Sequence, residues 1–237
     1  MIDVLDTIFI ISHILAGFTA LLIAPVAMWV HKGGLAHRRW GKVYYWAMFG
    51  IFVTAIALLF LRFNFFLFVI AILSFYTAFT GVQGLKRKRP HKGETPTWLD
   101  WGAAWIALVA GLSFMGWGIF LLTGLLNENW PVGFAILGIF FGVGISYTAY
   151  EDIRIFRSPP KDKVWWWYYH MNRMLSSYIA VVTAFLVVNL TPHMPPNLAW
   201  IVWAGPGIIG SPLIGRWISH YRRQFNRETS SRIQAPT

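Results

Sequence analysis

Seven apolar runs divide the chain, and each is long enough to form a membrane-crossing helix. The runs cover roughly residues 7–30, 42–62, 65–84, 99–124, 131–150, 164–189 and 198–219. An α-helix needs about 20 apolar residues to cross a bilayer. The sequence therefore predicts an all-α fold, a polytopic transmembrane bundle of about seven helices, with residues 1–220 as a single helical domain.

The basic residues predict the orientation of this bundle. Eighteen of the twenty Lys and Arg residues fall in the first, third and fifth connections or after the last run. Basic connections stay on the cytoplasmic side of a membrane. We therefore predict an outer amino terminus, an inner carboxyl terminus, and a basic, disordered cytoplasmic tail over residues 221–237. The first run follows Asp3 and Asp6 rather than a basic stretch, so it is interpreted as a span and not a signal peptide.

Composition narrows the partners and the chemistry. The net charge is +11, but 57% of the residues are hydrophobic. We interpret the charges as topology signals that face anionic lipid, and we expect the lipid bilayer, not nucleic acid, as the partner. The chain has no Cys, which excludes thiolate metal sites and iron–sulfur clusters. Protease, lipase and P-loop motifs are also missing from the sequence.

Two segments are predicted to be irregular. Pro206 and Pro212 lie inside the seventh run, where proline kinks or interrupts a helix. The outer connection around Asn127, Glu128 and Asn129 ends before Pro131, which we expect to begin the fifth helix.

Charged residues near the inner ends of the helices are candidates for a functional site, because ionisable groups within a membrane are costly. His170 and Arg173 share one face of the sixth helix by their i, i+3 spacing. Arg173 needs an anionic partner, and Asp100, Glu151 and Asp152 lie at the same predicted depth. The residues expected to converge there are His31, His37, Asp100, Glu151, Asp152, His170 and Arg173. A functional site and a structural ion pair that locks the helices together both fit this pattern.

His13 lies in the outer half of the first helix and forms an H-x3-G pattern with Gly17. Small residues at this spacing allow close helix approach. Two readings remain open: a packing face whose imidazole bonds a neighbouring carbonyl, or a ligand for haem or a metal.

Three segments together resemble an uncharacterised family of bacterial multipass membrane proteins. They are H-x3-G at His13, K-G-G-x-x-H-R-x-x-G-x-x-Y from Lys32 to Tyr44, and H-x-x-R-M at His170. The resemblance covers about residues 10 to 190. It implies a helical membrane fold, singles out His13, His37 and His170, and fits the bacterial plasma (inner) membrane, but it implies no activity.

The leading functional hypothesis is a membrane redox protein that carries b-type haem. Such proteins use pairs of His on facing helices. Here His37 or His31 would pair with His170, and a membrane redox partner would exchange electrons with the haem. His13 lies at the opposite depth, so it cannot ligate the same iron.

Three alternatives stay open. The first is a proton-coupled transporter that uses His13 and an interrupted seventh helix. The second is a membrane enzyme that binds zinc or another divalent metal through two or more of His31, His37 and His170 together with Asp152. The third is a structural assembly subunit with no cofactor.

Overall fold

The computed structural model describes residues 2–124 and 130–234, with side chains over 3–124 and 130–225. Within these ranges the chain forms seven α-helices and two short 3-10 helices. The α-helices are α1 (Ile2–Trp29), α2 (Leu35–Leu61), α3 (Phe65–Gly84), α4 (Trp98–Leu122), α5 (Val132–Arg157), α6 (Trp165–Leu190) and α7 (Ala199–Gln234). The all-α bundle predicted from the sequence is confirmed.

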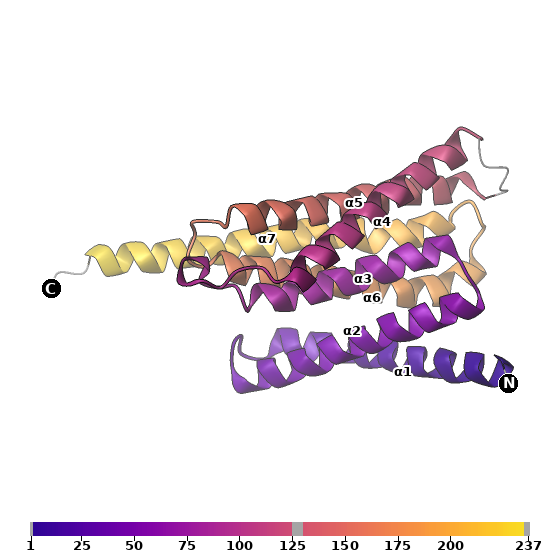
Figure 1. Cartoon of the computed structure of the whole chain (residues 1–237). Coiled ribbons are helices and arrows are strands. Elements are labelled where there is room, and N and C mark those ends of the chain that lie inside the picture. The colour runs from indigo at the N-terminus through magenta and orange to yellow at the C-terminus, as the bar shows by residue number, and fades with distance from the viewer. Residues whose placement is uncertain (1, 125–129, 235–237) are drawn as a thin grey trace.

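Six of these helices, α1 to α6, are long and apolar enough to cross a membrane, so the chain is an integral membrane protein. The connections between them alternate between the two ends of the bundle. Figure 1 shows the α1–α2, α3–α4 and α5–α6 connections at the same end as the carboxyl terminus. These connections and the carboxyl-terminal segment hold most of the basic residues of the sequence. Most of the positive charge therefore lies at one end of the bundle, and this asymmetry is the basis of the predicted orientation.

Helix ends are fixed by local contacts. The Asn64 side chain caps α3 by accepting from the Leu67 amide, and Thr97 with Asp100 forms a capping box at the start of α4. Pro131 is the N-cap of α5 rather than its first residue. The predicted connection through Asn127, Glu128 and Asn129 lies outside the described residues.

The helices pack most closely where glycine replaces a side chain. A Cβ on Gly142 in α5 would collide with the backbone of α4, and one on Gly118 would collide with α5. The α1–α2 hairpin is more peripheral, and most of the large apolar side chains of α1 are exposed. At the end away from the α1–α2 connection, the hairpin is closed by an ion pair of 2.5 Å between Asp6 and Arg62.

The α7 helix continues through both of its prolines, Pro206 and Pro212. It is therefore not interrupted, although the sequence left that possibility open. Residues 221–234, for which the sequence predicts a disordered tail, continue α7 as far as Gln234. The carboxyl-terminal part of α7 packs on α6, because Trp167 contacts the rings of Tyr221 and Phe225 at 4.9 and 5.5 Å between centroids. A seventh membrane crossing stays a prediction.

Candidate functional site

A buried carboxylate lies in the half of the bundle nearer the basic connections. Asp152 on α5 is fully buried. It accepts hydrogen bonds from the hydroxyls of Tyr76 (2.5 Å) and Tyr169 (2.8 Å) and from the Arg173 guanidinium (2.6 Å). Glu151 contacts the same guanidinium nitrogen at 2.9 Å, but its side chain is 40% exposed. The pairing of Arg173 with a carboxylate, expected from its position in an apolar helix, is therefore present, and it joins α3, α5 and α6.

A second buried ion pair joins the end of α3 to α4. Arg87 Nη1 lies 2.6 Å from Asp100 Oδ1, and both side chains are almost completely buried. The guanidinium also lies over the Phe156 ring at 4.6 Å. Asp100 is thus the partner of Arg87 and not of Arg173. Arg87 could not be distinguished from its neighbours in the sequence, because it lies in a run of four basic residues that is typical of a solvated loop.

His37 on α2 and His170 on α6 lie next to each other. Their ring centroids are 6.4 Å apart, with 81° between the ring planes. His37 Nδ1 lies 2.9 Å from the Ala27 carbonyl of α1, and His170 Nδ1 lies 2.8 Å from the Gly81 carbonyl of α3. The two imidazoles are therefore neighbours, and their membership of one functional site stays a prediction.

A second contact lies two helical turns farther along both helices. The Tyr44 hydroxyl and the Ser177 hydroxyl are 2.7 Å apart and buried. Tyr44 follows His37 by seven residues and Ser177 follows His170 by seven, so α2 and α6 run in the same direction past each other. Between the two contacts, on the same face of α2 as His37, Gly41 has nothing within 4 Å of the position of a Cβ.

His13 belongs to a different part of the molecule. Its Nδ1 lies 2.9 Å from the Thr54 hydroxyl, which itself donates to the carbonyls of Gly50 and Ile51. His13 precedes Ala27, the residue bonded to His37, by a helical rise of about 21 Å. It therefore does not share a site with His37. A Cβ on Gly17 would meet nothing within 4 Å, so the H-x3-G pattern makes no close helix contact at that glycine.

The three-ligand metal group considered from the sequence is not assembled. No group of three or more His, Cys, Asp or Glu side chains able to hold a metal ion occurs in the part of the chain that the structure describes. His31 is exposed in the turn between α1 and α2. Asp152 has both carboxylate oxygens bonded to the Tyr and Arg side chains described above.

Tyr76 and Lys88 both contribute to this region, but neither carries a strong sequence signal. Tyr76 reads as one more aromatic residue of an apolar helix, yet its hydroxyl reaches Asp152. Lys88 lies in the basic loop, yet its ammonium covers the Trp166 ring at 4.3 Å. Lys32 donates to the carbonyls of Met28 and Val30 at the end of α1, and partial burial lowers the pKa of its ammonium.

Comparisons of the chain with protein-family models, with curated proteins and with solved structures found no match. The resemblance of the three motifs to an uncharacterised membrane family therefore stays a prediction.

Proposed function

We propose that this integral membrane protein is an electron carrier that holds b-type haem between His37 and His170, at the inner ends of α2 and α6. The observation that carries the proposal is the pairing of two imidazoles on facing helices, each fixed by a backbone carbonyl.

The hydrogen bonds select the ring nitrogen that is free for a metal. A carbonyl oxygen only accepts, so Nδ1 of each neutral imidazole carries the proton and donates it. The lone pair is then on Nε2 of both rings. No hydrogen bond to either Nε2 atom comes from a residue that the structure describes. An imidazole held through Nδ1–H to a carbonyl, with Nε2 free, is the usual arrangement of a metal-binding His.

The separation of the rings favours ligands on opposite sides of one metal. With a metal–nitrogen bond of about 2.1 Å and a ring centroid roughly 1.2 Å behind its Nε2, two opposite imidazoles have centroids about 6.6 Å apart. Two imidazoles of a tetrahedral site would have centroids about 5.4 Å apart. The observed 6.4 Å is closer to the first value. The angle of 81° between the planes is compatible with it, since each ring can rotate about its metal–nitrogen bond.

The surroundings agree with a porphyrin better than with a bare ion. Two His without a third protein ligand are too few for a closed zinc site, which needs four ligands, whereas haem iron takes two axial ligands from the protein. Gly41 leaves open space one turn beyond His37. The ammonium of Lys88, which covers Trp166 one turn before His170 on α6, would offset the negative charge of a propionate.

His37 and His170 would hold the haem, and a haem held by two His would supply one-electron transfer. The residues of this chain would orient the imidazoles through the carbonyls of Ala27 and Gly81. The membrane-embedded helices would limit access of water to the site.

The optical spectrum of the full-length protein, purified in mild detergent after expression with added haem precursor, tests the proposal. We expect a Soret band that shifts on reduction with dithionite and a near-infrared signal of bis-imidazole iron. His37→Ala and His170→Ala should each abolish it. His193→Ala, which changes a His outside the site, should leave it intact.

Gly41→Leu is a steric test that spares both ligands. Its side chain would occupy the open space beside His37, so haem content should fall severalfold while the chain still inserts. Gly102→Leu, at a second glycine with nothing within 4 Å of its Cβ position, is the matched control. A colourless wild-type protein, or full haem content in either His variant, would show that the two rings only form an edge-to-face contact.

A further inference from the structure

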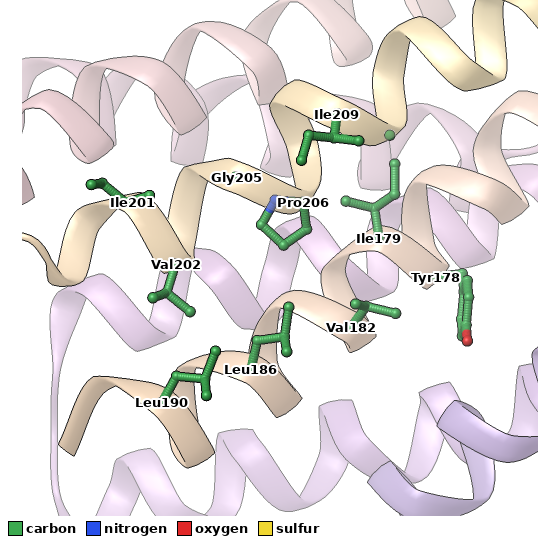
Figure 2. Close-up of a pocket in the computed structure, with 11 residues that line it drawn as sticks. Tyr178, Ile179, Val182, Leu186, Leu190, Ile201, Val202, Gly205, Pro206 and Ile209 are labelled. Carbon is green, nitrogen blue, oxygen red and sulfur yellow. The ribbon is translucent and has the colours of Figure 1, made fainter. Parts of the chain in front are cut away.

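An apolar groove separates α6 from α7 in the half of the bundle away from the basic connections. Its volume is about 450 Å³. Figure 2 shows the side chains that face each other across it, Val182, Leu186 and Leu190 on α6 and Val202 and Pro206 on α7. Tyr178 closes one end, and its hydroxyl is turned away to donate to the Leu21 carbonyl. The groove therefore presents hydrocarbon and no free polar side chain.

The dimensions of the groove restrict what fits in it. Tyr178 and Leu190 are separated by a helical rise of about 18 Å. A groove of this length with an apolar lining accommodates a single extended hydrocarbon chain.

The depth of the groove matches one leaflet of a bilayer. Tyr178 lies near the middle of α6 and Leu190 at its end. The distance of about 18 Å between them is close to half of a hydrocarbon core about 30 Å thick. The side chains of Ile201 and Ile209 at the rim are 44% and 66% exposed, so the groove opens sideways toward the lipid.

The floor of the groove is kept open by a glycine. Gly205 has nothing within 4 Å of the position of a Cβ, so a larger side chain there would project into the groove without striking the protein. Pro206 next to it has no N–H and lies against the groove as an apolar ring.

From this shape, depth and lining we infer that the α6–α7 groove is a binding site for one acyl chain of a bilayer phospholipid. Burial of a methylene contributes about 0.8 kcal/mol, so a long chain is held tightly and a short one is not. Because the lining has no free polar side chain, binding depends on the chain and not on the headgroup. The bound chain would fill the space between α6 and α7 and support the packing of α7.

Native mass spectrometry of the full-length protein with added phospholipid tests the inference. We expect one retained molecule per chain, equally for palmitoyl-oleoyl phosphatidylglycerol and phosphatidylcholine, and no retention of dihexanoyl phosphatidylcholine. Gly205→Leu should lower retention at least tenfold. Gly144→Leu, at an exposed glycine of α5 with nothing within 4 Å of its Cβ position, should retain lipid as the wild type does.

If Gly205→Leu fails to give folded protein, Gly205→Ala decides the matter, and it should lower retention severalfold. Retention that is unchanged in the folded glycine variant overturns the inference. Selection by headgroup overturns it as well, as does a bound molecule other than a phospholipid, such as an isoprenoid quinone. None of these outcomes depends on haem content, so the inference and the proposed function fail separately.

Discussion

Removing the charge of Asp152 should destabilise the bundle far more than removing the charge of Glu151. Both carboxylates contact the same nitrogen of Arg173, at 2.6 and 2.9 Å. Asp152 is fully buried, while the Glu151 side chain is 40% exposed. Loss of one partner from a buried ion pair costs about 3–5 kcal/mol, whereas exposed pairs contribute at most about 1 kcal/mol.

Asp152→Asn keeps the shape of the side chain and isolates the effect of charge. In the wild type both carboxylate oxygens of Asp152 accept hydrogen bonds. In the variant an amide nitrogen replaces one of these oxygens and would face a hydroxyl or guanidinium donor. We therefore expect a loss of about 3–5 kcal/mol in the free energy of unfolding. Glu151→Gln should cost at most about 1 kcal/mol.

Denaturation of the two variants in mixed micelles, followed by circular dichroism, measures this difference. Arg173→Met combined with Asp152→Asn should cost less than the sum of the single changes, because neither charge is then left alone. Equal losses for Asp152→Asn and Glu151→Gln would refute the reasoning, since exposure would then not control the cost of removing a charge.

Three other predictions concern a packing contact, a buried ion pair and the membrane orientation. Gly84→Ala places a Cβ 2.5 Å from the Tyr169 ring, so it should cost about 1–3 kcal/mol in the same unfolding assay, while Gly102→Ala should be neutral or slightly stabilising. Arg87→Met leaves the buried Asp100 without its cation and should cost about 3–5 kcal/mol, with Asp100→Asn restoring part of the loss in the double variant. Reporter fusions after residues 38, 90 and 160 should all read cytoplasmic and one near residue 194 should not, so a periplasmic signal at residue 90 would contradict the orientation.

The helices were predictable because span length and loop charge are strong, local signals. The pairing of the buried charges was predictable only in part. Arg173 lies alone in an apolar run, so its need for an anion was visible, but the choice between Asp100 and Asp152 depends on which helix faces which. Arg87 was hidden because a charge run gives no sign of which member turns inward. The α6–α7 groove was not predictable either, because it depends on how closely the side chains of two neighbouring helices pack.

One glycine on α3 links the two parts of the inner region. The Gly81 carbonyl accepts from His170 Nδ1 at 2.8 Å. A Cβ at Gly81 would lie 3.0 Å from both Arg173 Cβ and Met174 Sδ, so the absence of a side chain lets α6 approach α3. The same close approach places Arg173 at Asp152 and fixes the His170 ring toward His37. The buried ion pair therefore holds in place the helix that carries one of the two imidazoles, and it supports the proposed haem site through the position of α6 rather than by contact with the iron.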